Sequence, residues 1–321
     1  MILKFMITIL SFRSTLRKVA LALSIVLTLV ACGSSPDAKP EGVTVVATTS
    51  IWGDVATQIV GSDGTVEVLI PVGSDPHDYL PSAGQIADLH RADLVIANGL
   101  GLEEGLVDVL RAAADDGVNV YEVGPDLDPL PFHGGTTGSD GGQDDGELDP
   151  HVWFDPDRVS RAAAAIAERL SEIEPGVDWQ SKADGYISRM TRLDAQIEGL
   201  IAAVPDGNRK LITNHDALGY FAARYGFTVV GVVIPGGSTL AEPSSAELAD
   251  LVATIQKEKV PAIFAETTNP SVLAEAVAAE AGRDIAVVEL YTGSLGPSGS
   301  GADTLETMLL TDSRLIADAL S

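Results

Sequence analysis

Three of the five histidines stand in short loops next to residues that end strands or begin helices. His77 follows an apolar run that ends at Pro71, His215 follows the run 210–213, and His151 precedes a helical stretch. In open α/β sheets, ligand-binding groups lie beyond the carboxyl ends of the strands. We therefore expect these three side chains to converge. Three neutral imidazoles suit a first-row divalent cation such as zinc.

Other interpretations of these histidines exist. Each alone fits a helix cap or a hydrogen-bond donor beside a site, and three imidazoles together could serve acid–base chemistry. The chain contains no Gly-x-Ser-x-Gly, no cysteine–histidine pairing and no His-Glu-x-x-His motif. We therefore predict a binding protein, not an enzyme. A zinc-dependent hydrolase stays an alternative, although no general base stands out for it.

The remaining two histidines lie in a different setting. His90 is expected on an exposed helical surface, and His133 lies in the loop 132–147, which is rich in Gly and Asp. This composition is typical of a flexible, solvated loop. A weak metal-recruiting role for the loop is an alternative.

The elements around the histidines follow a repeated pattern. Strands alternate with helices, which predicts parallel sheets in an α/β fold. Ile70-Pro71-Val72-Gly73-Ser74 is echoed by Ile234-Pro235-Gly236-Gly237-Ser238, and 81–89 is echoed by 243–251. A repeat that keeps its order predicts two lobes of one architecture. The expected strands of the two halves are 43–47, 66–70, 94–97 and 121–123, then 210–213, 228–234, 262–265 and 286–290.

Two helical patterns separate the halves. Asp155-Pro156 is typical of a helix start and opens the pattern 157–173. The second pattern, 178–204, contains no proline and is about 37 Å long as a helix. We predict that it joins an N-terminal lobe, 43–177, to a C-terminal lobe, 205–321, with the metal site in the cleft between the lobes.

The N-terminus is typical of a secreted lipoprotein. Residues 1–31 combine basic residues with a short apolar stretch, as in a signal peptide, and a start of translation after Met1 is an alternative. Leu29-Val30-Ala31-Cys32 resembles a lipobox, which implies cleavage before Cys32 and a lipid anchor on its sulfur. A flexible tether, 32–42, would follow. The predicted location is the outer face of the cell membrane.

Composition excludes several classes of protein. The single cysteine excludes a disulfide framework and cysteine-rich zinc modules. Twenty basic residues against 46 acidic ones give a net charge of −26, which disfavours nucleic acid as a partner. We expect a monomer that carries a cation.

Several motifs together resemble the cluster A-I family of solute-binding proteins, the zinc and manganese receptors of ABC importers. The resemblance covers the chain from Thr44 to the last helix. It implies two α/β lobes joined by one long helix, metal-ligand roles for His77, His151 and His215, and delivery of the metal to a membrane permease. The motifs are Pro76-His77-Asp78-Tyr79, 98–103 (NGLGLE), 149–156 (DPHVWFDP), 214–221 (NHDALGYF) and 290–296 (LYTGSLG).

One position departs from the family pattern. Relatives often carry Asp or Glu, as a fourth metal ligand, where this chain has Gly293. A water or Glu266 would then complete the shell, and Glu266 could equally accept a hydrogen bond from a ligand. Three nitrogens without that carboxylate favour zinc over manganese, which prefers oxygen. A manganese receptor and a surface adhesin are the alternatives.

Overall fold

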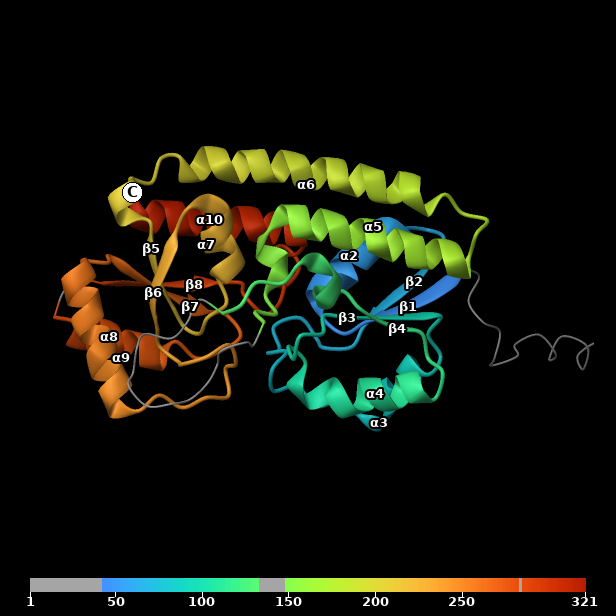
Figure 1. The fold of residues 1–321 in the computed structure, drawn as a ribbon, viewed down its shortest axis with the longest axis horizontal. Helices are drawn as coiled ribbons and strands as arrows, with labels where there is room; N and C mark the ends of the chain where they lie inside the picture. Colours follow the sequence, from blue (N-terminus) through green and yellow to red (C-terminus); the bar gives the residue numbers. More distant parts are fainter. Residues whose placement is uncertain (1–41, 133–147, 283–284) are drawn as a thin grey trace, which may run out of the picture. The chain divides into compact units, whose positions relative to one another are not determined.

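Two sheets of four parallel strands each form the framework (Figure 1). A computed structural model describes residues 42–132, 148–282 and 285–321. Residues Glu41–Ser321 form one compact unit that contains both sheets. Cys32 with its signal and tether, and His133 with residues 133–147, lie outside the described residues.

The first sheet has the strand order β2-β1-β3-β4. Its inner strands are β1 (Val43–Ala47) and β3 (Leu94–Ala97), and its edges are β2 (Gly64–Val68) and β4 (Val120–Glu122). The inner strands are nearly continuous apolar runs, because helices cover both faces of the sheet. The helices of this lobe are α2 (Ser50–Val60), α3 (Ala83–Leu89) and α4 (Val107–Asp115).

The second sheet repeats this order as β6-β5-β7-β8. β5 (Lys210–Thr213) and β7 (Ala262–Glu266) lie inside, and β6 (Thr228–Val232) and β8 (Ala286–Leu290) form the edges. Its helices are α7 (Gly219–Tyr225), α8 (Ser245–Glu258) and α9 (Val272–Glu280). The equal strand order confirms the expectation of two α/β lobes built alike.

Two helices connect the sheets, and the longer one extends along both halves above α5 (Pro156–Ile173) and α10 (Leu305–Leu320) (Figure 1). They are α5 and α6 (Trp179–Ile201), and α6 packs against α2 from the first half and α10 from the second. One apolar cluster runs through these helices and both sheets, while each sheet has a smaller cluster on its other face. A continuous core of this kind opposes large hinge motion. The expected lobe boundaries, 43–177 and 205–321, stay predictions.

Three of the four edge strands, β2, β4 and β6, differ from the sequence expectation in their bounds, whereas β8 has the expected bounds 286–290. β2 covers Gly64–Val68 and not 66–70, because Gly64 pairs in register with Val43 of β1. The amides of Leu69 and Ile70 still donate to the β1 side of the sheet, at 2.9 and 2.8 Å. Pairing therefore continues up to the loop that carries His77.

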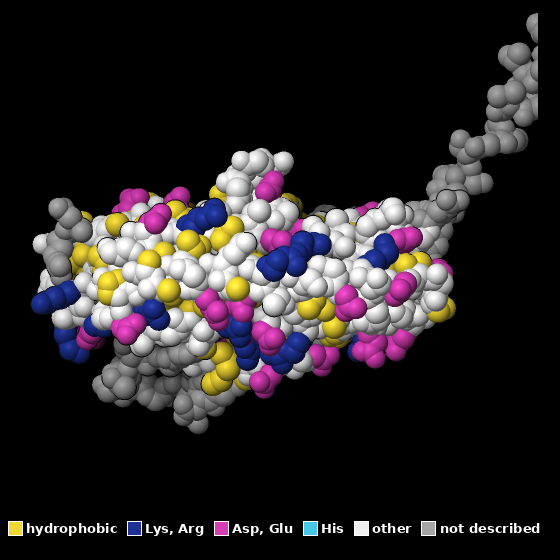
Figure 2. Space-filling model, turned by 90° about the horizontal axis from the view of Figure 1, so that it is seen from above, with side chains coloured by type: hydrophobic (Ala, Val, Ile, Leu, Met, Phe, Trp, Pro, Cys, Tyr) yellow, Lys and Arg dark blue, Asp and Glu magenta, His cyan; other side chains and the backbone are white. Residues whose placement is uncertain are grey.

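The surface over α6 shows acidic and basic side chains interspersed, without a continuous patch of either sign (Figure 2). Hydrophobic side chains are scattered over the same face. Within the described residues, no helix combines the length and the apolarity that a membrane span needs.

Candidate metal centre

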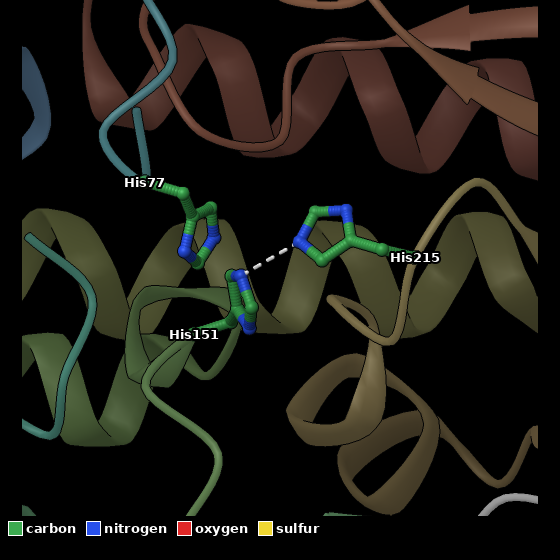
Figure 3. Close-up of side chains that lie close together, drawn as sticks. All are labelled: His77, His151 and His215. Carbon is green, nitrogen blue, oxygen red and sulfur yellow. Dashed lines mark hydrogen bonds between the residues drawn. The ribbon is translucent and has the colours of Figure 1, made fainter. Parts of the chain in front are cut away.

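The three loop histidines meet inside the molecule (Figure 3). Their ring centroids lie 4.9 Å (His151 to His215), 5.4 Å (His77 to His215) and 5.7 Å (His77 to His151) apart. One nitrogen of each ring lies within 4.8 Å of the others. Nitrogens around a tetrahedral zinc ion stand about 3.3 Å apart, given bonds of about 2.0–2.1 Å. A modest approach of the rings would therefore place all three around one ion.

Two of these histidines are supplied by strand ends. His77 lies in the loop after β2, and the backbone N–H of His77 donates to Asp75 Oδ1 over 3.0 Å. His215 lies directly after β5, where the Thr213 hydroxyl donates to the His215 carbonyl over 2.6 Å. Both positions are at the carboxyl edge of their sheet, as the strand pattern predicts.

The third histidine comes from the connection between the lobes. His151 precedes the 3₁₀ turn Val152–Phe154, which leads into α5. Asp149 Oδ1 accepts a hydrogen bond from the His151 backbone N–H at 2.9 Å and pairs with ring Nδ1 at 2.8 Å. The Trp153 ring packs against the imidazole with centroids 5.3 Å apart. The ring is thus held on two sides.

Carboxylates orient two of the three rings. Asp149 faces Nδ1 of His151, and Glu266, at the end of β7, faces Nδ1 of His215. With a proton on each Nδ1, both Nε2 atoms keep a lone pair for a metal. These two Nε2 atoms lie 3.0 Å apart. At that distance the two atoms share a proton in a hydrogen bond when no metal is bound (Figure 3), and a bound cation would take the place of this proton.

The third ring has a different environment. Neither nitrogen of His77 makes a hydrogen bond to a described residue, and an oxygen of Glu104 lies 3.5 Å from its Nδ1. All three imidazoles are at most 3% exposed. Burying a polar nitrogen without a hydrogen-bond partner costs free energy. A metal ion bound to a ring nitrogen of His77 would offset this cost.

Burial and neighbouring charges shift the pKa values of the rings. Burial, together with the other two histidines, lowers the pKa of His77 to about 4. Burial and His215 likewise lower the pKa of His151 well below its usual value. Burial also acts to lower the pKa of His215, but the Glu266 carboxylate outweighs it and raises that pKa. At neutral pH, His77 and His151 are therefore neutral and able to bind a metal.

The position of the expected fourth ligand, Gly293, carries no side chain. A Cβ at Gly293 would lie 2.9 Å from Cδ of Pro76, so this loop packs closely on the residue before His77. Glu266 lies at Nδ1 of His215 and is not a member of the cluster of ligand atoms that the described residues form. Of the two roles considered for Glu266, its position fits the hydrogen-bond acceptor.

Sequence reasoning missed two supporting carboxylates, Asp75 and Asp149. Each stands two residues before a histidine in the tripeptide Asp-Pro-His, and that repeated tripeptide was the available signal. His90 lies at the end of α3, exposed, and is not part of the cluster.

Comparisons with known proteins agree with this geometry. Residues 45–319 match the family model described as zinc-uptake complex component A, periplasmic. A manganese-binding lipoprotein, MntA, of Halalkalibacterium halodurans is 32% identical over 86% of this chain and 87% of its own. The zinc-binding protein TroA of Treponema pallidum is 32% identical over 89% of this chain and 92% of its own.

A solved structure shares the fold. The periplasmic zinc-binding protein TroA from Treponema pallidum superposes with a TM-score of 0.77 at 30% sequence identity, over 87% of this chain and 99% of its own. A Mn-bound periplasmic metal-binding protein from Candidatus Liberibacter asiaticus superposes with a TM-score of 0.75 at 23% identity, over 87% and 99% of the two chains. The second likeness concerns the fold alone.

Proposed function

The chain belongs to the family of periplasmic zinc-uptake complex component A proteins, and on this premise we propose that it captures zinc outside the cytoplasm and delivers it to an ABC-type permease. The family consists of solute-binding components and not of enzymes. Zinc would be the cargo and would undergo no covalent chemistry.

One observation carries the proposal. Three buried imidazoles from distant parts of the chain bring one nitrogen each within 4.8 Å of the others. Two of them have carboxylates on Nδ1, which leaves Nε2 as the ligand atom. Without a metal, the 3.0 Å contact between the Nε2 atoms of His151 and His215 needs a shared proton, and the ring nitrogens of His77 make no hydrogen bond to a described residue. A shared cation would replace that proton and also satisfy His77.

The donor set supports zinc in particular. Zinc accepts three nitrogen ligands in a tetrahedral shell with a water at the fourth position. Manganese prefers oxygen ligands and higher coordination numbers, and the described cluster consists of nitrogens. Protonation of the histidines competes with the metal, so acid would release it.

Manganese is the second candidate, because MntA of Halalkalibacterium halodurans, a relative at 32% identity, is named a manganese-binding lipoprotein. Asp75 and Glu104 also stand beside His77 and could supply oxygen after a small rearrangement. The adhesin alternative stays an untested prediction.

Metal competition tests the proposal directly. The metal-free protein is titrated with zinc and with manganese by calorimetry, and then with each metal in the presence of the other. The proposal predicts that zinc displaces manganese and that the zinc affinity is lost on His215→Ala. His90→Ala is the control, because His90 lies outside the cluster. Stronger binding of manganese would transfer the proposal to the second candidate, and unchanged zinc binding by His215→Ala would refute the site.

The lipid anchor is tested separately. We propose that Cys32 carries a diacylglycerol after removal of residues 1–31. Intact-mass measurement of protein extracted from membranes should show the mass of the lipid on a chain that begins at Cys32, and Cys32→Ala should release the protein from the membrane fraction. Membrane association that survives Cys32→Ala would contradict the anchor.

A further inference from the structure

The segment 98–103 contributes no ligand atom to the histidine cluster, although its sequence is distinctive. It forms a tight turn at the carboxyl end of β3, next to the first sheet's share of the site. Gly99, Leu100 and Gly101 all have positive φ values, of 74°, 56° and 79°. Leu100 is a non-glycine residue in the left-handed region, which is energetically unfavourable and persists only where the surroundings enforce it.

Glu103 enforces this turn from inside. Its side chain is buried, and Oε1 accepts hydrogen bonds from the Asn98 backbone N–H at 2.7 Å and from the Thr48 hydroxyl. Oε2 accepts from the Gly99 backbone N–H at 3.2 Å. The loop after β3 is therefore closed by hydrogen bonds to the Glu103 carboxylate, which lies six residues after the end of the strand. These bonds fix the backbone of Asn98 at the start of the loop.

The side chain of Asn98 is completely buried and uses all of its polar atoms. Its Oδ1 accepts from the indole N–H of Trp52 over 2.8 Å. That donor fixes the orientation of the amide, because the NH₂ group cannot accept a hydrogen bond. Nδ2 consequently donates its two hydrogens to the carbonyls of Gly99 and Pro150, each at 3.0 Å.

Pro150 is the residue directly before His151. The second lobe holds the same segment from the other side, because the Tyr220 hydroxyl donates to the Asp149 carbonyl at 2.7 Å and the Trp153 indole donates to the Thr292 carbonyl at 3.0 Å. Asn98 holds it from the first lobe, through the hydrogen bond to Pro150. This bond therefore ties the position of His151 to the lobe that carries His77.

We propose that Asn98 is a positioning residue that holds His151 at the metal through the Pro150 carbonyl, with Glu103 supporting it. This inference rests on the proposed function, since it concerns the affinity of the same site. Hydrogen-bond partners one shell beyond metal ligands commonly change affinity about 10- to 100-fold. Asn98 acts one bond further out, so about tenfold weaker zinc binding is expected for Asn98→Ala.

The test compares Asn98→Ala with Leu110→Ala, a core variant in α4 whose side chain packs in the smaller apolar cluster of the first sheet, which contains none of the three histidines. Both lose thermal stability, but only Asn98→Ala should weaken zinc binding, measured by competition with a chromogenic chelator. Cobalt serves as a spectroscopic probe: Asn98→Ala should shift the visible bands of bound Co²⁺, and Leu110→Ala should leave them unchanged. Glu103→Gln is a milder variant and should shift the same bands in the same direction.

A double-mutant cycle identifies the path of the effect. In a His151→Ala background, Asn98→Ala should cause no further loss of zinc affinity. An equal loss in both backgrounds would overturn the proposal, as would a zinc affinity for Asn98→Ala within about twofold of the wild type.

A readout without metal separates this inference from the proposed function. In the metal-free protein, the Nδ1 proton of His151 should change its NMR position in Asn98→Ala and not in Leu110→Ala. If the wild type binds no zinc, the proposed function fails while this signal still reports the positioning role. If the wild type binds zinc and the His151 signal does not move, only the positioning role fails.

Discussion

The tripeptide Asp-Pro-His occurs at 75–77 and again at 149–151, and the two copies share one hydrogen bond but differ in the others. In both, an aspartate Oδ1 accepts the backbone N–H of the histidine two residues later, at 3.0 and 2.9 Å. In the second copy, the same carboxylate also pairs with the imidazole of its own histidine. In the first copy, Asp75 Oδ2 accepts from Thr239 and Asn269 of the second lobe, at 2.6 and 2.9 Å.

This difference shows which hydrogen bonds of the site the tripeptide itself determines. A hydrogen bond from the backbone N–H of the histidine to the aspartate side chain two residues earlier closes a turn, and the tripeptide can form this turn by itself. The second partner of the carboxylate is set by tertiary packing. Asp149 orients a ring, whereas Asp75 ties the loop of His77 to the opposite lobe. The copies therefore contribute equivalent ligands through different supports.

The largest effect expected is the loss of either histidine. His77→Ala and His151→Ala should each weaken zinc binding by at least about 100-fold, because a four-ligand zinc site is worth about 10–16 kcal/mol, or about 3 kcal/mol per ligand. Chelator competition measures both. A much smaller loss for His77→Ala would break the equivalence of the two copies and remove the first from the site.

The pH dependence of stability is expected to be nearly as large. The lowered pKa of His77, about 4 in the folded protein against 6.5 as the ordinary value, means that the unfolded chain binds a proton that the folded chain excludes. The metal-free protein should therefore lose stability as pH falls from 6.5 to about 4, by about 3 kcal/mol at most from this group.

Denaturant unfolding of the wild type and of His77→Gln across this pH range isolates the contribution. The stability difference between them should change between pH 6.5 and about 4 and stay constant above. The contribution of His215 to stability depends on pH in the opposite direction. Burial acts to lower the pKa of His215, but Glu266 raises it overall. The stabilisation from His215 is therefore present at pH 6.5 and below, and it is lost as the pH rises through the pKa of the folded protein. A constant difference between wild type and His77→Gln would contradict the shift.

Removing the charge of Asp149 and of Asp75 should weaken zinc binding to different extents. Asp149→Asn keeps the shape but removes the charge that polarises Nδ1–H of His151, and should weaken zinc binding about tenfold. Asp75→Asn keeps an oxygen for the His77 amide, and Asp75 makes no hydrogen bond to the His77 ring, so a smaller loss is expected. Calorimetric titration of both variants measures the ratio, and equal losses would show that the carboxylates have the same role.

The smallest effect expected concerns the link between the lobes. Thr239→Val removes the hydroxyl that donates to Asp75 and leaves the size of the side chain nearly unchanged. One hydrogen bond is worth about 0.5–1.5 kcal/mol, so about threefold weaker zinc binding is expected in a chelator assay. Thr254→Val is the matched control, since its hydroxyl bonds within α8. Equal affinities for the two variants would show that the hydrogen bond from Thr239 to Asp75 does not contribute to zinc binding.

Much of the fold was predictable because the informative elements are buried. β1, β3 and β5 have the bounds expected from their apolar runs. The expected bounds of the edge strand β2 are wrong by two residues, because its start depends on register with β1 and not on its own half-exposed residues. The sequence reasoning did not identify α4 and α9. α4 follows Leu106 and begins without a side-chain cap, so the usual start signal is missing there. α9 follows Ser271, a residue type common at helix starts, but the Ser271 hydroxyl donates to Glu275 and does not cap the helix.

The site was predictable in its histidines and less so in its supports. His77 and His215 stand in loops that follow strands of the two sheets, His151 stands in the connection before α5, and the structure brings the three together. Whether Glu266 would be a ligand or an acceptor depended on the side from which β7 approaches His215, which no local pattern encodes. The two Asp-Pro-His copies show the same limit, because identical tripeptides acquire different partners.

Crystals of the zinc-loaded protein, measured on both sides of the zinc absorption edge, show whether the three imidazoles share one ion. We expect one anomalous peak at about 2.0–2.1 Å from a ring nitrogen of His77, His151 and His215 alike. A peak bound elsewhere, or one that leaves any of the three rings outside its coordination shell, would contradict this expectation.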